Sequence, residues 1–263
     1  MFRPRIIPCL LLEDKGIVKT VKFKDPRYIG DPINAIRIFN EKEADELMFL
    51  DIMASRNQGF FSKLKTRQMP FDLLKKISRE CLMPLSYGGG ITTLDEMQKL
   101  FSIGIEKIVI NTNSIENPQL IKKASETFGS QSIISSIDAR KNLKGGYEVY
   151  TRGGLKAISR DPVNLALSMQ EMGAGEIMIT SIDCDGMMEG YDIDLIKSVS
   201  DAVDIPVIAC GGAGKLSDLH KAHEIGHASG MAAGSMFVFH GRKRAVLISY
   251  PDQKELENLF SEA

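Results

Sequence analysis

Residues 84–97 read PLSYGGGITTLDEM and residues 206–219 read PVIACGGAGKLSDL, so the same order of features occurs twice in the chain. Each stretch passes from a short apolar run to a glycine cluster and then to an amphipathic segment. This order is typical of a buried parallel strand, a tight turn and a helix. Glycine suits the turn because it has no Cβ and adopts positive φ readily. The pair therefore predicts one βα unit in each half of the chain.

The same alternation extends through the whole sequence. Strands are predicted at 6–12, 46–51, 83–87, 107–110, 132–138, 176–180, 206–210 and 229–233. Helices are predicted at 32–43, 71–81, 94–102, 118–128, 162–172, 194–203, 216–225 and 253–260, and a β-hairpin at 145–159. Pro32, Pro118 and Pro162 suit the first helical turn, each after a polar residue that can cap. Eight strands, each followed by a helix, predict an α/β fold of the (β/α)8 TIM-barrel type.

The domain organisation follows from length and from the repeat. A barrel of this type takes about 250 residues, and no linker or low-complexity tract divides the 263 residues, so 1–263 is expected to be one domain. The first half carries LDI (50–52), GGGI (88–91) and NTNS (111–114); the second carries SID (181–183), GGAG (211–214) and AAGS (232–235). This order favours two half-barrels related by a pseudo-twofold axis. The alternative is that the halves share only the βα pattern.

The composition excludes several classes of protein. The chain has 33 Lys plus Arg, 34 Asp plus Glu, a net charge of −1 and 43% hydrophobic residues, which excludes a disordered chain and argues against a broad nucleic-acid or membrane surface. No apolar run reaches the roughly 18 residues that span a bilayer, and the first residues lack a signal-peptide layout. The cysteines, 9, 81, 184 and 210, form no CxxC pair. We expect a reduced, cytoplasmic protein without a metal site or a cofactor.

Two glycine clusters predict anion sites. Gly89 and Gly90 follow the third strand, and Asn111 and Thr112 follow the fourth. In the second half, Gly212 follows the seventh strand and Gly234-Ser235 follows the eighth. Backbone N–H groups at such turns approach phosphates closely, and in a barrel these two pairs of loops lie opposite each other. The sequence therefore predicts one ligand with two phosphates; the alternative is that the glycines only make tight turns.

Acidic residues at the carboxyl ends of strands are the candidate catalysts, because barrel enzymes place their chemistry there. They are Asp51, Asp138, Asp183 and Asp185. Asp138 closes the fifth strand between the two predicted anion sites, where burial would raise its pKa and suit it to proton transfer. The alternative is a structural acid that caps a loop or forms an ion pair with Arg140. Under the twofold relation, the counterpart of Asp138 is Leu11.

Charged residues also occur at the opposite ends of the strands. Arg5, Glu46, Lys107 and Glu176 begin the first, second, fourth and sixth strands. They predict a ring of alternating charge at the barrel bottom, with separately solvated surface charges as the alternative. His220 and His223 are one turn apart on a predicted outer helix, where a solvated face is favoured over metal binding.

Several of these motifs resemble a known family. RIIPCL (5–10), GDP (30–32), GGGI (88–91), INT (110–112), IDAR (137–140), TSIDCDG (180–186) and GGAGK (211–215) occur in the order found in HisF, the cyclase subunit of imidazole glycerol phosphate synthase. The resemblance implies a barrel in a heterodimer with a HisH-like glutaminase that supplies ammonia. It implies conversion of a phosphoribulosyl aminoimidazole carboxamide ribonucleotide to imidazole glycerol phosphate and an aminoimidazole carboxamide ribotide, a lyase-type step of histidine biosynthesis.

The resemblance also assigns roles to residues. Asp138 matches the catalytic aspartate of the fifth strand. Gly89, Gly90, Asn111 and Thr112 match one phosphate site, whereas Asp185, Gly186, Gly212, Gly234 and Ser235 match the other. Lys19 matches a substrate-binding lysine of a mobile first loop. Arg5, Glu46, Lys107 and Glu176 match the gate through which ammonia enters.

Two departures from the family pattern leave the function open. Leu11 stands where the family has its other catalytic aspartate, and Cys210 stands where it has a serine. Loss of one acid–base group lowers a rate by about 10²–10⁴, unless Glu13 or Asp14 takes its place. Residues 8–24 resemble a HisF-like branch that channels ammonia to a separate ATP-dependent enzyme. In that branch the acceptor is a nucleotide sugar, amidinated for lipopolysaccharide or O-antigen biosynthesis. A third candidate, a barrel isomerase acting one step earlier, fits the motifs less well.

Overall fold

Eight parallel strands close into a barrel in the computed structural model, which describes residues 3–54 and 69–261. In order around the barrel, they are β1 (Arg5–Glu13), β4 (Leu47–Asp51), β5 (Leu85–Gly88), β6 (Lys107–Ile110), β7 (Ile133–Lys141), β10 (Glu176–Ser181), β11 (Val207–Cys210) and β12 (Gly230–Ala233). Closure comes from β12 pairing with β1, where Arg5 lies opposite Gly230. The predicted (β/α)8 barrel is confirmed, and β6 has the predicted bounds.

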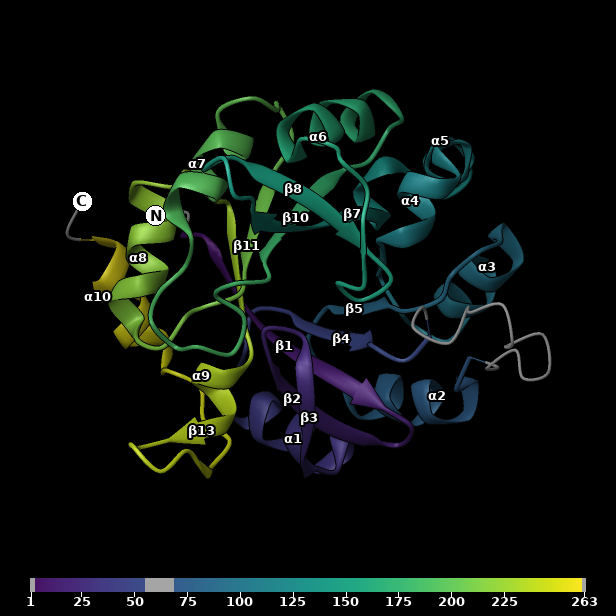
Figure 1. Ribbon diagram of the computed structural model, residues 1–263. Helices are drawn as coiled ribbons and strands as arrows, with labels where there is room; N and C mark the ends of the chain where they lie inside the picture. Colours follow the sequence, from purple (N-terminus) through teal and green to yellow (C-terminus); the bar gives the residue numbers. More distant parts are fainter. Residues whose placement is uncertain (1–2, 55–68, 262–263) are drawn as a thin grey trace.

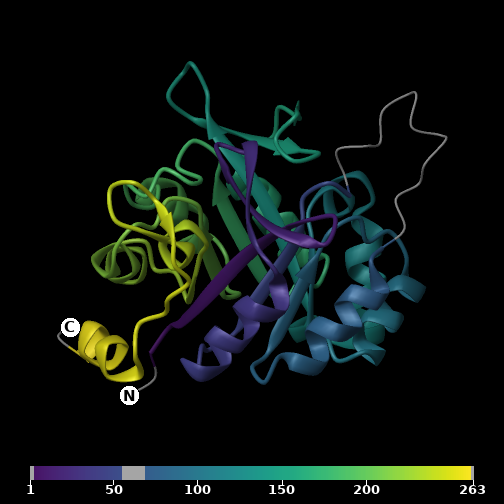
Figure 2. The same ribbon diagram turned by 90° about the horizontal axis from the view of Figure 1, so that it is seen from below.

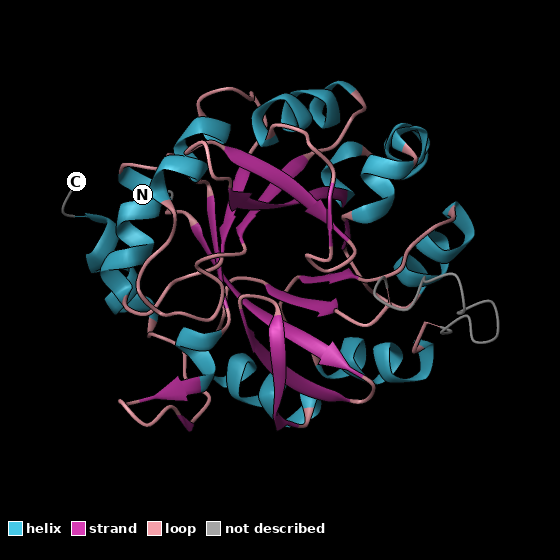
Figure 3. Cartoon of the chain, in the orientation of Figure 1, coloured by secondary structure: helices cyan, strands magenta, loops and turns pink. Residues whose placement is uncertain are grey.

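Helices surround the strands on the outside of the barrel (Figures 1 and 3). They are α1 (Pro32–Glu41), α2 (Phe71–Glu80), α3 (Leu94–Ser102), α5 (Pro118–Phe128), α6 (Pro162–Glu171), α7 (Ile193–Ser200), α8 (Leu216–Glu224) and α10 (Gln253–Ser261). Asp31 and Asp161 accept the first backbone N–H groups of α1 and α6, as predicted. Asn117 makes no such side-chain bond to α5, so the predicted cap is wrong there.

Alternating side chains along each strand divide the core into two parts. Outward residues such as Ile6 and Leu10 pack under the helices in the main cluster. Inward residues fill the barrel in a smaller cluster of Ile7, Cys9, Met48, Val109, Ile134, Met178, Ile208 and Ala232. Since consecutive side chains of a strand point to opposite faces, the strand positions fix which residues line the barrel axis.

Hairpins project from the carboxyl ends of the barrel strands, on the side away from both termini (Figure 2). β8 (Tyr147–Thr151) and β9 (Lys156–Ala157) lie within the predicted hairpin at 145–159, and β8 also pairs with the end of β7. A second hairpin, β2 (Gly16–Val21) and β3 (Lys24–Gly30), follows β1 and was not predicted, because β3 is mostly exposed and polar. β13 (Phe239–His240) and β14 (Ala245–Val246) form a third.

Other unpredicted elements are too short for a sequence period: the helices α4 (Thr112–Glu116) and α9 (Ser235–Val238), and the 3-10 turn Ser130–Ser132. Both short helices follow equivalent strands, β6 and β12, which fits the predicted repeat. The segment between the strand predicted at 46–51 and the helix predicted at 71–81 lies mostly outside the described residues. His220 and His223 are half-buried and both pack against Phe260 of α10, so the predicted solvated histidine face is only partly exposed. Within the described residues, no helix combines the length and apolarity needed to cross a membrane.

Candidate active site

A pocket opens at the carboxyl ends of the barrel strands. It is bordered by every residue to which the family resemblance assigns catalysis or substrate and phosphate binding: Lys19, Gly89, Gly90, Asn111, Thr112, Asp138, Asp185, Gly186, Gly212, Gly234 and Ser235. Asp51 also borders it, whereas Asp183 lies aside in an ion pair with Arg140. The pocket is lined as well by Cys9, Thr20, Phe23 and Thr180, which the sequence reading missed. Thr180 could have been predicted from the alternation of side chains along a strand. It stands two residues beyond Met178 and four beyond Glu176, so all three point to the inside of the barrel.

The two glycine clusters lie on opposite sides of this pocket. β5 and β11 are four strands apart in a closed circle of eight. Gly90 has φ +65°, and Gly212 has φ +121°. A Cβ on Gly212 would lie against the carbonyl oxygen of Gly190, so glycine is required by both conformation and space. The geometry thus provides two backbone cradles that face each other across the barrel mouth.

Lys19 is held inside the pocket. Its side chain is buried, and Nζ donates to the carbonyl oxygen of Cys9 at 2.7 Å. The β2–β3 hairpin that carries it is fixed to the loop after β10, because Lys22 N donates to Asp185 O at 2.9 Å and Thr20 Oγ1 donates to Asp185 Oδ2 at 3.0 Å. A Cβ on Gly234 would overlap Nζ of Lys19, so the ammonium group lies next to the cradle that contains Gly234.

Asp138 is the central titratable group of the pocket. It is 8% exposed, and burial together with the nearby charge of Asp185 raises its pKa to about 7, against hydrogen bonds from Thr180 and Asn111 that lower it. Arg140 pairs with Asp183 at 3.2 Å, so the alternative of an Asp138–Arg140 pair is wrong. Burial also raises the pKa of Asp185, although the charge of Lys19 opposes the shift. A carboxyl group with a pKa near neutrality can both accept and release a proton at physiological pH.

The two departures from the family pattern face the same pocket. Leu11 borders it from β1 and pairs in register with Val18 and Leu50. Glu13 and Asp14 lie further along, at the hairpin turn, and are not among the residues that border the pocket. Cys210 forms a hydrogen bond with the thiol of Cys9, which lowers the pKa of Cys9 and raises that of Cys210.

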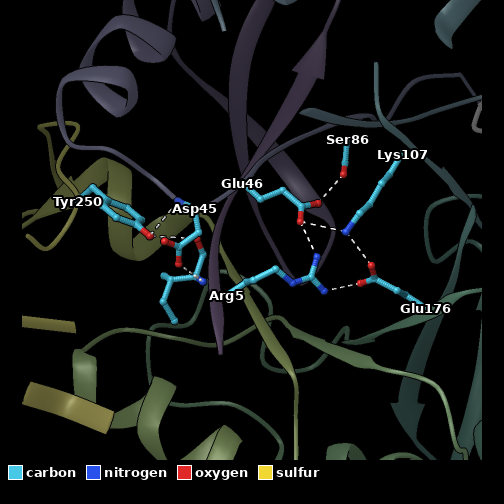
Figure 4. A network of polar contacts seen from close by, with 8 residues as sticks. Arg5, Asp45, Glu46, Ser86, Lys107, Glu176 and Tyr250 are labelled. Carbon is cyan, nitrogen blue, oxygen red and sulfur yellow. Dashed lines mark hydrogen bonds and ion pairs between the residues drawn. The ribbon is translucent and has the colours of Figure 1, made fainter. Parts of the chain in front are cut away.

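At the opposite end of the barrel, four charged side chains form a closed ring (Figure 4). Arg5 contacts Glu46 at 2.6 Å and Glu176 at 2.5 Å, and Lys107 contacts the same two carboxylates at 3.2 and 2.7 Å. Ser86 Oγ donates to Glu46 at 2.6 Å. Burial lowers the pKa of Arg5, but the hydrogen bond and charge of Glu176 outweigh it, and the pKa is raised. The predicted alternating ring is present, and its charges are not separately solvated.

The ring and the pocket are separated by one layer of side chains. Each of the four charged residues is followed, two positions later in the sequence, by an apolar residue buried in the barrel interior. These residues are Ile7 after Arg5, Met48 after Glu46, Val109 after Lys107 and Met178 after Glu176. Val109 and Met178 also line the pocket. Two residues of a strand span about 7 Å, so the ring lies close beneath the pocket floor.

Comparison with known proteins agrees with this geometry. Residues 5–243 match the family model described as histidine biosynthesis protein. The chain belongs to this family. It is 50% identical to a provisionally named imidazole glycerol phosphate synthase subunit, hisF2, of Pseudomonas aeruginosa, over 98% of this chain and 99% of the relative. It is 45% identical to a provisionally named HisF subunit of Leptospira interrogans (99% and 100% covered), and 40% identical to the HisF subunit of Alkaliphilus metalliredigens (90% and 91%). These relatives make the chain a HisF-type barrel.

Proposed function

We propose that this HisF-type chain is the barrel subunit of a glutamine amidotransferase. A HisH-like glutaminase docks over the charged ring and releases ammonia there, and the ammonia crosses the barrel to the pocket. The observation that carries this proposal is the closed ring lying one side-chain layer below a pocket with two opposed glycine cradles.

The layer between ring and pocket selects what can cross. It consists of aliphatic and methionine side chains with little polar surface. An ammonium ion would lose its hydration there without compensation, whereas neutral ammonia loses far less. An ion pair of the ring must separate before ammonia can pass. Arg5 and Lys107 each contact both Glu46 and Glu176, so each keeps one carboxylate partner when its other contact opens.

The first candidate reaction is the cyclase step of histidine biosynthesis. Two anion cradles across one pocket suit a substrate with a phosphate at each end. Asp138 lies among the pocket residues with a pKa of about 7, so it can exchange a proton with a nitrogen or hydroxyl of that substrate. Lys19 beside Gly234 would pair with the phosphate in that cradle.

The second candidate is ammonia delivery to a separate ATP-dependent enzyme that amidinates a nucleotide sugar. Leu11 favours it, because an aliphatic side chain at this position neither gives nor accepts a proton and leaves Asp138 without its counterpart. In this function the ring is used and the acid–base chemistry of the pocket is not.

The test combines two measurements on the purified chain. Mixing it with a HisH-like glutaminase from the same organism should give a heterodimer with increased glutamine hydrolysis. Product absorbance is then followed with the ribulosyl substrate and free ammonium. Turnover supports the cyclase reaction, and heterodimer formation without turnover supports ammonia delivery. Absence of both the heterodimer and turnover would exclude the proposal.

A further inference from the structure

The two glycine cradles of the pocket differ in the charge beside them. The cradle that contains Gly234 has the buried ammonium group of Lys19 next to it. The other, called the first cradle from here on, is formed by Gly89, Gly90, Asn111 and Thr112. Among the described residues that line the pocket, Lys19 is the only lysine or arginine. A phosphate monoester carries a charge of about −1.5 to −2 at pH 7, so a phosphate in the first cradle needs a cation from outside this lining.

Arg152 begins the turn between β8 and β9, and that turn lies against the first cradle. The backbone N of Arg152 donates to Oγ1 of Thr112 at 3.1 Å, and the next residue, Gly153, lines the pocket. The φ of Arg152 is +56°, a conformation that is uncommon for residues other than glycine and that occurs often at functional sites. The backbone of Arg152 is therefore held at the rim of the pocket, beside the first cradle.

The guanidinium group of Arg152 is held away from the cradle by Glu116. Its Nη2 lies 3.1 Å from Oε1 of Glu116, which is the last residue of α4 and stands one helical turn beyond Thr112. Both side chains of this ion pair are about one-third exposed, at 33% and 36%, so the pair contributes little to stability and opens readily. Nε of Arg152 is buried and has no hydrogen-bond partner in the part of the chain that the structure describes. Because buried polar groups normally have a partner, Glu116 satisfies this guanidinium only in part.

We propose that Arg152 is the cation of the first cradle. When a phosphate group binds at Gly90 and Thr112, the guanidinium leaves Glu116 and pairs with the phosphate. The exchange needs only rotation of the side chain, because the backbone of Arg152 already contacts Thr112. Guanidinium binds phosphate through two parallel N–H bonds, which are stronger than bonds between neutral groups. Glu116 thus competes with the phosphate for Arg152. This inference rests on the phosphate pocket of the proposed function and holds for either candidate reaction.

Inorganic phosphate is the probe, because it tests the cradle without the ribulosyl substrate. It is titrated at pH 7.5 and constant ionic strength into the ¹⁵N-labelled full chain, and backbone amide shifts are followed by NMR. The amides of Gly90 and Thr112 report on the first cradle, and those of Gly212 and Gly234 report on the opposite one. Neither glutaminase binding nor turnover enters this measurement, so its result is separate from the test of the proposed function.

Arg152→Gln keeps the backbone donor to Thr112 and removes the charge. We expect it to raise the Kd for phosphate at the first cradle at least about tenfold, as for the loss of a charge-assisted hydrogen bond, and to leave the Kd at the opposite cradle unchanged. The matched control is Arg160→Gln, which removes an exposed arginine shortly after the same hairpin and should change neither Kd.

Glu116→Gln tests the competition from the other side. Removal of the surface ion pair should lower the Kd at the first cradle about two- to fivefold. In the Arg152→Gln background the same substitution should change that Kd less than about twofold, because its effect passes through Arg152. Three results would overturn the proposal: no phosphate-induced shift at Gly90 and Thr112 in the wild type, an Arg152→Gln variant with the affinity of Arg160→Gln, or an effect of Glu116→Gln that persists without Arg152.

Discussion

Lys19 and Gly234 share one space at the barrel mouth, since a side chain at position 234 would overlap Nζ of Lys19. The lysine lies there because its Nζ also donates to the carbonyl oxygen of Cys9. The absence of a side chain on Gly234, directly after β12, thus decides where the ammonium group of Lys19 on β2 is placed. A phosphate bound in the cradle at Gly234 would meet this cation directly.

Gly234→Ala should therefore displace Lys19 and weaken phosphate binding. One charge-assisted hydrogen bond contributes about 1.5–3 kcal/mol, so the Kd for the ribulosyl substrate should rise roughly 10- to 100-fold. Isothermal titration measures it. Gly30→Ala is the matched control, because a Cβ there meets nothing within 4 Å. Equal affinity in both variants would show that Lys19 does not bind the phosphate.

The barrel, the glycine cradles and the ring could be predicted from the sequence, because each depends on patterns among residues that are close together in the chain. Buried parallel strands give apolar runs, and the alternation of inward residues relates Glu176 to Met178 and Thr180. The place of Lys19 does not follow, because it depends on the β2–β3 hairpin. That hairpin is fixed by bonds of Thr20 and Lys22 to the distant Asp185, and its polar second strand resembles a loop in sequence. Tertiary contacts, not local periodicity, decide that part of the pocket.

Asp138→Asn should stabilise the fold above neutral pH. The pKa of Asp138 is raised to about 7 in the folded protein, against a model-peptide value near 3.9. Its contribution to stability is therefore full below about pH 4 and lost as the pH rises to about 7. Asparagine removes this loss, which is at most about 1.4 kcal/mol per pH unit over that interval.

Thermal unfolding of both proteins from pH 4 to 9 measures the effect. The Tm of Asp138→Asn should exceed that of the wild type by a margin that grows up to about pH 7 and is constant above it. If the cyclase reaction occurs, the same variant should lose turnover. A margin that does not change with pH would mean that Asp138 ionises in the fold with an ordinary pKa.

Leu11→Asp should restore or raise cyclase activity. The new carboxylate would border the pocket on β1, opposite the strand that carries Asp138, and would complete an acid–base pair. The expected gain in kcat with free ammonium is about 10²–10⁴. Leu11→Asn is the control of similar shape without a carboxylate, and an equal gain in that variant would assign the effect to polarity alone. If neither variant has activity, the pocket does not bind the ribulosyl substrate productively.

Lys107→Met should open the charged ring while keeping an aliphatic chain of similar length. Glu176 and Glu46 would each lose one cation but keep Arg5, and Glu46 would keep Ser86. We expect the fold to lose about 1–3 kcal/mol and the ring to leak. In the complex with the glutaminase, more ammonia should then appear in bulk solution per glutamate formed, as measured by a coupled ammonia assay. With free ammonium in place of glutamine, activity should match the wild type, because the pocket is unaltered. Lys122→Met on α5 serves as the control, and a wild-type ratio of ammonia to glutamate in Lys107→Met would remove the ring from the path of ammonia.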